Sequence, residues 1–156
     1  MANGFQLIST HEECTKNTAR TIASFFRPGD VVVLDGDLGA GKTHFVKGFA
    51  EGLHSTDTVT SPTFAIANFY RTDAFSLLHI DLYRIETIDE FNDLGLSDYF
   101  DSAIVLIEWG LKFPEYPDEY LLVSFELKDG GDRLISFGAK GGKYDLILER
   151  MRNELC

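Results

Sequence analysis

The residues best suited to chemistry are eight consecutive positions, Gly36 to Thr43, with the sequence GDLGAGKT. They match G-x-x-x-x-G-K-[ST], the phosphate-binding loop of nucleotide triphosphatases. Gly36 and Gly41 permit backbone angles that a Cβ would forbid, so successive N–H groups can turn inward around an anion. Lys42 is expected to reach the β- and γ-phosphates, and Thr43 to place its hydroxyl on Mg²⁺. This pattern predicts a nucleotide site.

The segments on either side of the loop are those that such a site needs. The apolar β-branched run VVVL, residues 31–34, predicts a strand, and HFVKGFAEGL, residues 44–53, predicts a helix. A helix that starts near Lys42 would point its positive dipole end at the β-phosphate. The predicted nucleotide-contacting residues are therefore Asp37, Leu38, Gly39, Ala40, Gly41, Lys42, Thr43 and His44.

A phosphate site also needs a carboxylate on the metal side and a group that positions water. Asp81 ends the apolar run SLLHI, and Glu108 ends the run AIVLI. Either acid could hold Mg²⁺ through water, and their spacing alone does not rank them. The alternative is that each only caps its strand.

The segment around Asp81 reads H-x-D-x-Y-R. In a strand, His79, Asp81 and Tyr83 would share one face. This triplet predicts either a contact to the γ-phosphate or its water, or a hydrogen-bonded edge strand. Trp109 directly follows Glu108, where its indole could fill the core or pack on a base, a loop or a partner.

The polar loop after the predicted helix contains T-S-P-T, residues 60–63. A threonine there could sense the γ-phosphate as switch loops do, or form an ordinary turn. Neither an N/T-K-x-D base-recognition motif nor a D-x-x-G switch is present in the sequence. Guanine selection is therefore unsupported, and adenine is the expected base.

The remaining elements predict an α/β fold of the P-loop NTPase kind, with three layers and a central mixed parallel and antiparallel sheet. Thr10 and Glu13 suggest a capping box that starts the first helix. Because few helices are available for parallel crossovers, part of the sheet must be antiparallel. Further strands are expected at 5–8, 64–71, 75–84, 103–109, 121–127 and 133–139, and further helices at 87–93 and 142–152.

Length, charge and composition limit the class of protein. The 156 residues predict a single domain, residues 1–156. Net charge is −11, with 14 Lys and Arg that do not cluster, so strong direct nucleic-acid binding is not expected. The sequence contains neither a long apolar span nor a secretory signal pattern, and its two cysteines have no metal spacing. We therefore expect a cytoplasmic protein without a membrane association.

Taken in order, GDLGAGKT, T-SPTF (60–64), HIDLYR (79–84) and IEWG (107–110) resemble the TsaE family, also called YjeE. The resemblance covers nearly the whole chain. It implies a P-loop ATPase that uses ATP and Mg²⁺ in bacterial biosynthesis of tRNA N6-threonylcarbamoyladenosine (t⁶A). It also implies association with the TsaD and TsaB proteins, where hydrolysis would reset the modifying complex for further turnovers.

The same resemblance implies roles for individual residues. Thr43 and Glu108 would hold Mg²⁺, and Asp81 would lie near the γ-phosphate and act in hydrolysis, so Lys42, Asp81 and Glu108 are the predicted catalytic group. Trp109 would be a functional position beside the site. Thr10 is a predicted contact on the base side, and Arg133 a predicted contact from the C-terminal strands.

Two other functions use the same loop. A small-molecule kinase would need an acceptor pocket and usually an arginine-bearing lid, and the seven arginines do not cluster into one. A nucleotide-sensing adaptor would share every motif but would not need Asp81 for hydrolysis.

Overall fold

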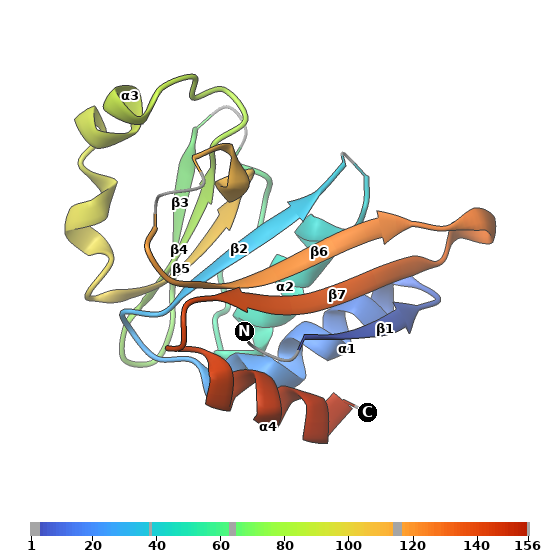
Figure 1. Cartoon of the computed structure of the whole chain (residues 1–156). Coiled ribbons are helices and arrows are strands. Elements are labelled where there is room, and N and C mark those ends of the chain that lie inside the picture. The colour runs from blue at the N-terminus through green and yellow to red at the C-terminus, as the bar shows by residue number, and fades with distance from the viewer. Residues whose placement is uncertain (1–3, 38, 63–64, 114–116, 156) are drawn as a thin grey trace.

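A seven-stranded sheet forms the centre of the molecule (Figure 1). The computed structural model describes residues 4–37, 39–62, 65–113 and 117–155. The strands are β1 (Phe5–Ser9), β2 (Val31–Gly36), β3 (Ala67–Arg71), β4 (Ser76–Asp81), β5 (Ala103–Glu108), β6 (Tyr120–Leu127) and β7 (Arg133–Lys140). Their order across the sheet is β1-β7-β6-β2-β5-β4-β3. β6, β2, β5 and β4 run parallel, while the pairs at both edges are antiparallel.

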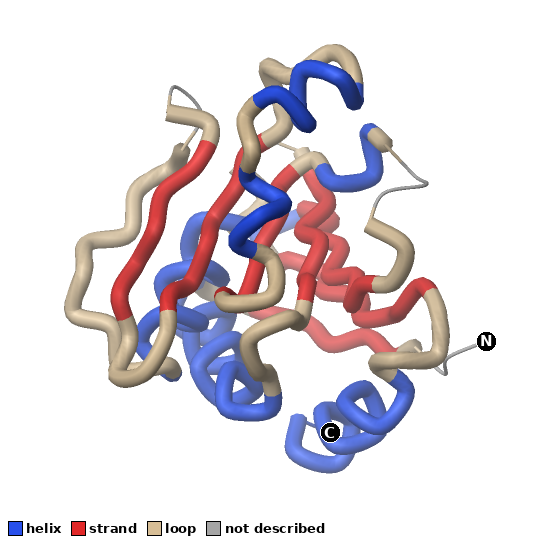
Figure 2. Tube along the Cα trace, turned by 90° about the vertical axis from the view of Figure 1, so that its left-hand side faces the viewer, coloured by secondary structure: helices blue, strands red, loops and turns tan. Residues whose placement is uncertain are grey.

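Helices and short helical turns cover both faces of the sheet (Figure 2). The α-helices are α1 (Glu12–Ile22), α2 (Lys42–Gly52), α3 (Ile88–Asp93) and α4 (Asp145–Leu155), with 3₁₀ turns η1 (Ala23–Phe25), η2 (Leu96–Tyr99), η3 (Gly110–Lys112) and η4 (Asp129–Gly131). α1, α2 and α4 share one apolar core with the sheet, and α3, η2 and η3 share the other. The predicted three-layer α/β fold with a mixed sheet is therefore confirmed.

The central strands alternate their side chains between these two cores. Val32 and Leu34 of β2 face the α1–α2 side, whereas Val31 and Val33 face the α3 side, and all four are buried. A strand covered on both faces must be apolar along its whole length, which explains the continuous hydrophobic run. β2 and β5 therefore form the rigid centre from which the functional loops emerge.

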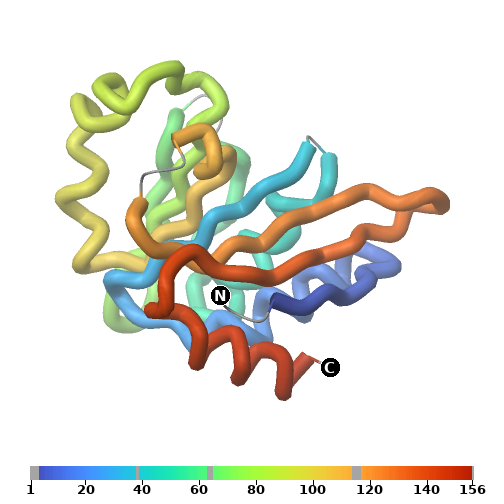
Figure 3. The backbone as a smooth tube through the Cα atoms, viewed as in Figure 1, coloured from blue at the N-terminus to red at the C-terminus, as the bar shows by residue number. Residues whose placement is uncertain are grey.

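The β6–β7 hairpin extends beyond the other strands (Figure 3). Its strands pair from Tyr120 opposite Lys140 to Leu127 opposite Arg133. The two strands correspond to those predicted from the sequence at 121–127 and 133–139. The hairpin also brings the start of β7 back toward the loop that follows β2, because β6 lies next to β2 in the sheet.

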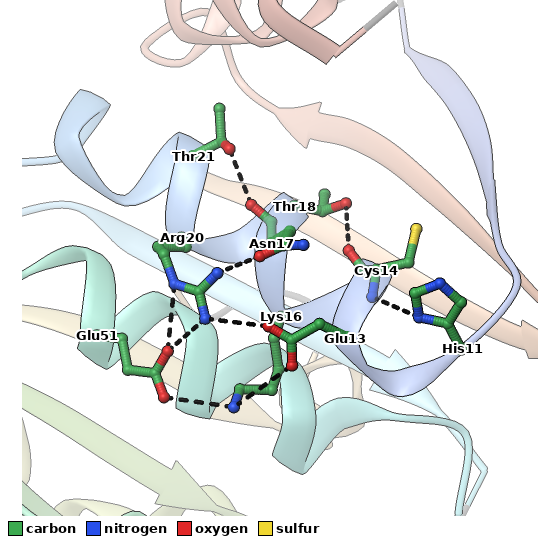
Figure 4. A network of polar contacts seen from close by, with 9 residues as sticks. All are labelled: His11, Glu13, Cys14, Lys16, Asn17, Thr18, Arg20, Thr21 and Glu51. Atoms are coloured by element: carbon green, nitrogen blue, oxygen red, sulfur yellow. Dashed lines mark hydrogen bonds and ion pairs between the residues drawn. The ribbon is translucent and has the colours of Figure 1, made fainter.

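α1 and α2 pack closely along the same side of the sheet. Charged side chains bridge the two helices, and Arg20 donates to Glu51 at 3.2 and 2.5 Å (Figure 4). Lys16 lies 3.4 Å from the same carboxylate. The hydrogen bond from Arg20 lowers the pKa of Glu51 below its ordinary value. Because these groups are largely exposed, the bridge fixes orientation more than it adds stability.

Two details of the sequence prediction are wrong. His11, not Thr10, caps α1, because the His11 ring accepts a hydrogen bond from the Cys14 amide. β4 ends at Asp81, so Tyr83 lies in a turn and does not share a strand face with His79 and Asp81. The Asp81 carboxylate itself accepts from the Tyr83 amide at 2.9 Å, which favours the turn over a continued strand.

Candidate functional site

The glycine loop joins the carboxyl end of β2 to the start of α2. Gly41 is the N-cap of α2 with φ of 108°, in the left-handed region that favours glycine. At Gly36, a Cβ would lie 2.8 Å from the carbonyl oxygen of Phe125 on the neighbouring strand. Since Gly41 has no side chain with which to cap the helix, the first-turn amides of α2 remain available to an anion.

The loop forms one wall of a cavity of about 350 Å³. The cavity brings together loop residues, two strand-end acids, an indole and a guanidinium. It is lined by Glu12, Gly39, Gly41, Lys42, Thr43, His44, Ser61, Asp81, Glu108, Trp109 and Arg133. Nine of these eleven residues are sequence-predicted site residues, so segments far apart in the chain converge on one pocket.

Asp81 and Glu108 lie side by side at one end of the cavity. They are register partners on the parallel strands β4 and β5, and each is only 4% exposed. Glu108 is also the register partner of Leu34 on β2, two residues before Gly36. Both acids therefore stand at the carboxyl edge of the sheet, where parallel α/β sheets bind ligands.

Lys42 brings a positive charge to the lining of the cavity. Its ammonium group donates to the Gly36 carbonyl and lies 4.5 Å from the centroid of the Trp109 ring. Lys42 is 5% exposed, so its charge is held close to the loop. Trp109 has φ of 62°, unusual for a large side chain, and its ring packs 5.3 Å from that of Tyr83.

Arg133 and His44, which also line the cavity, make further contacts near the glycine loop. Arg133, at the start of β7, donates to the Gly39 carbonyl at 3.0 Å and to the Gly131 carbonyl at 2.5 Å. His44 and Glu12 approach to 3.2 Å between Nε2 and Oε1, which links the first turns of α2 and α1. The β6–β7 hairpin and α1 thus each contact a residue that the sequence predicts to bind nucleotide: Gly39 and His44 respectively.

Some predicted residues lie outside this pocket. Asp37 and Ala40 line a neighbouring cavity of about 540 Å³ together with Trp109 and Phe125. Thr10 is exposed and precedes the cap of α1, but the nearby Glu12 lines the site. Leu38 lies outside the described residues. Within the T-S-P-T loop, Ser61 lines the cavity, whereas Thr63 is also outside the described residues.

The sequence pattern singled out His79 but did not predict its contact with Glu108. The imidazole is fully buried, and its Nε2 lies 2.7 Å from Oε2 of Glu108. His79 therefore supports one of the site acids rather than forming the cavity wall. Its signal in the sequence was a polar residue inside an apolar run, but only strand register reveals the partner. Ser61 lies within the T-S-P-T motif, although only a threonine of that motif was predicted to act, and Glu12 carried no comparable signal.

The oxygen groups around the cavity fit a magnesium–nucleotide complex. Thr43, Asp81 and Glu108 offer a hydroxyl and two carboxylates, and Mg²⁺ prefers oxygen ligands. Within the described ranges, no group of three or more His, Cys, Asp or Glu side chains is arranged to hold a metal ion.

The described part of the chain contains no helix with the length and apolar character needed to span a bilayer.

Comparisons with known proteins relate the chain to a single family. The family model of the threonylcarbamoyl adenosine biosynthesis protein TsaE matches residues 9–135. The tRNA threonylcarbamoyladenosine biosynthesis protein TsaE of Bacillus subtilis (strain 168) is 43% identical over 145 residues, which cover 92% of this chain and 90% of that protein. Its namesake from Rickettsia felis is 35% identical over 143 residues, covering 90% of this chain and 84% of that protein.

A solved structure extends the match to the fold. The crystal structure of Bacillus subtilis YdiB superimposes with a TM-score of 0.85 at 36% sequence identity, covering 99% of this chain and 97% of that chain. The family model, the relatives and the fold therefore agree, and the chain belongs to the TsaE family of tRNA threonylcarbamoyladenosine biosynthesis proteins.

Proposed function

We propose that this chain is a Mg²⁺-dependent ATPase that acts on the TsaD and TsaB proteins to permit repeated turnover in t⁶A synthesis. The observation that carries the proposal is the pairing of Asp81 with Glu108 beside the glycine loop. A loop that binds phosphates, and two acids within one pocket, are the parts that phosphoryl transfer to water requires.

Each side chain has a proposed task. Lys42 leaves its contact with the Gly36 carbonyl and neutralises charge on the β- and γ-phosphates. Thr43 and Glu108 hold the metal, and Asp81 orients or deprotonates the attacking water. When bound, Mg²⁺ would neutralise charge that develops on the phosphate oxygens. Arg133 is a second cation beside the loop, because its guanidinium already contacts Gly39.

The negative net charge of the chain suits a function that is carried out through protein partners. A net charge of −11 disfavours a direct grip on the tRNA backbone. We therefore propose that the chain contributes to tRNA modification through TsaD and TsaB, and that its compartment is the cytoplasm. Hydrolysis by the isolated chain should be slow, since partners complete the site of many switch-type NTPases.

The test compares two variants in a reconstituted complex with TsaD and TsaB. Lys42→Ala should weaken ATP binding by at least about tenfold, because it removes a charged contact to phosphate. Asp81→Asn should retain ATP binding but slow hydrolysis by about 100-fold or more, the usual loss for a group that positions or activates water. Binding is measured by calorimetry, and hydrolysis by phosphate release.

Asp101→Asn is the matched control, because Asp101 is an exposed acid at the opposite end of β5. Full t⁶A turnover by both site variants would contradict the proposal. Repeated turnover with a nonhydrolysable ATP analogue would favour the adaptor, and transfer of phosphate to a metabolite would favour the kinase.

A further inference from the structure

A line of buried polar groups leads away from the cavity, starting at Glu108. Oε2 of Glu108 lies 2.7 Å from Nε2 of His79, and both residues are buried. This contact engages one carboxylate oxygen of Glu108, a residue that also lines the cavity. The imidazole therefore restricts the rotation of an acid that would otherwise turn freely about its last bond.

The line continues from His79 to the loop before β3. Nδ1 of His79 lies 3.5 Å from the Tyr70 hydroxyl. That hydroxyl donates to the Thr60 carbonyl at 3.0 Å and accepts from the Thr60 amide at 3.2 Å. One phenol thus holds both backbone polar groups of Thr60, and the adjacent Ser61 lines the cavity.

Strand register explains why these groups meet. Tyr70 lies two residues after Asn68, and Asn68 is the register partner of His79 across β3 and β4. His79 in turn pairs with Leu106 of β5, two residues before Glu108. Because side chains repeat every two residues along a strand, all four polar side chains lie on the same face of the sheet. The Asn68 amide completes the cluster at 3.3 Å from the Tyr70 hydroxyl.

A neighbouring backbone contact ties the same loop to the other site acid. The amide of Asp81 donates to the Ile66 carbonyl at 2.7 Å, and the Ile66 amide donates to the Pro62 carbonyl at 2.6 Å. Ile66 has φ of 68°, a costly conformation for a β-branched residue. The loop is therefore fastened to both strand-end acids, once through side chains and once through the backbone.

We propose that His79 is a positioning residue that holds Glu108 for the metal–nucleotide complex, and that Tyr70 transmits the state of that site to the loop at Thr60 and Ser61. This rests on the proposed function, because it requires Glu108 to act toward a metal-bound nucleotide. It adds a mechanism by which occupancy of the pocket changes a surface segment. Thr60 is exposed, so a partner protein could read that change.

The test of His79 compares two amide substitutions that differ in reach. A Gln side chain places its amide nitrogen near the position of Nε2 of the His79 ring. An Asn side chain is shorter and reaches only the position of Nδ1. Binding of a nonhydrolysable ATP analogue is measured by calorimetry with Mg²⁺ and with EDTA. His79→Asn should reduce the magnesium-dependent gain in affinity by about 10-fold or more, the usual effect of removing a group that orients a metal ligand. Affinity in EDTA should stay within about twofold of wild type, and His79→Gln should restore most of the gain.

The test of Tyr70 uses amide hydrogen exchange at Thr60. Tyr70→Phe removes the hydroxyl alone, so exchange of the Thr60 amide should accelerate by about fivefold or more, the equivalent of one net hydrogen bond. Adding Mg²⁺ and the analogue should change protection at Thr60 in wild type but not in this variant. Tyr120→Phe, at a buried tyrosine of β6 outside this cluster, is the control and should behave as wild type.

The outcomes separate this inference from the proposed function. If wild type gains no affinity from Mg²⁺, the proposed function fails. If Mg²⁺ raises the affinity of His79→Asn as much as it raises that of wild type and of His79→Gln, the positioning role of His79 is wrong. If Thr60 protection responds to the nucleotide equally in wild type and Tyr70→Phe, transmission through Tyr70 is wrong.

Discussion

Lys42 shows how a buried positive charge is compensated by its neighbours. Its ammonium group is almost completely buried, bonded to the Gly36 carbonyl and positioned over the Trp109 ring. Both contacts compensate a desolvated charge, and in the proposed function phosphates would replace them. The aromatic face is thus part of the electrostatics of the pocket as well as part of its wall.

We expect nucleotide binding to change the emission of Trp109, the single tryptophan of the chain, because Lys42 moves from the indole to phosphate. Lys42→Met, which keeps the bulk but removes the charge, should alter the ligand-free emission and abolish the response at nucleotide concentrations that saturate wild type. The measurement is a fluorescence titration. Lys47→Met, on the same helix but outside the lining of the cavity, is the control. Unchanged emission during binding proven by calorimetry would contradict this account.

At the scale of elements, the close packing of α1 on α2 holds the helix that follows the glycine loop. α2 carries two glycines on the side that faces α1. A Cβ on Gly48 would lie 2.1 Å from the Lys16 carbonyl oxygen, and one on Gly52 would lie 2.5 Å from that of Arg20. These glycines let the two backbones approach more closely than side chains would permit.

Gly48→Ala should therefore destabilise the protein by about 1–3 kcal/mol, the usual cost of overpacking. Helix propensity alone favours Ala over Gly by up to about 1 kcal/mol, so the sign of the change tests the packing. Urea unfolding provides the measurement.

Gly138→Ala in β7 is the matched control, since a Cβ there would meet nothing within 4 Å. It should leave stability unchanged or slightly raised. An increase in stability for Gly48→Ala would show that the helices pack less closely than described.

At the scale of the whole molecule, Tyr144 joins the C-terminal helix to the central sheet. Its buried hydroxyl accepts a hydrogen bond from the Val31 amide at 2.7 Å, at the beginning of β2. Burial raises the pKa of Tyr144 to about 12, against an ordinary value of 10.0. The last helix and the strand that leads to the glycine loop therefore share one polar contact inside the core.

This contact makes stability sensitive to alkali. Because the folded-state pKa is raised, the unfolded chain loses its proton first, and the stabilising contribution is complete below pH 10 and lost as pH rises toward about 12. Across that window, the free energy of unfolding should fall by up to about 3 kcal/mol more in wild type than in Tyr144→Phe.

At neutral pH, Tyr144→Phe should cost about 1–3 kcal/mol, because the buried Val31 amide loses its acceptor. Urea unfolding at several pH values measures both effects. Tyr99→Phe, at a half-exposed tyrosine of η2, should change neither. Parallel pH curves for wild type and Tyr144→Phe would contradict the assignment.

The elements and the loop could be predicted from sequence because their causes are local. A β-branched run and a helical pattern need only neighbouring residues, and the strand Val31–Gly36 and the helix Lys42–Gly52 formed as expected. The cap of α1 was missed because His11 competes with Thr10 for the same local bond, and pattern alone favours a hydroxyl. Asp81 and Glu108 were recognised as strand-end acids for the same local reason.

Tertiary structure alone decided which of these groups meet. Strand order made Asp81 and Glu108 neighbours, and the β6–β7 hairpin beside β2 brought Arg133 to the Gly39 carbonyl. Register turned His79 toward Glu108, away from the cavity where its motif had suggested a phosphate contact. The reason is physical: a strand's two-residue period assigns side chains to a face, but the partner on that face depends on hydrogen bonds between strands distant in the sequence.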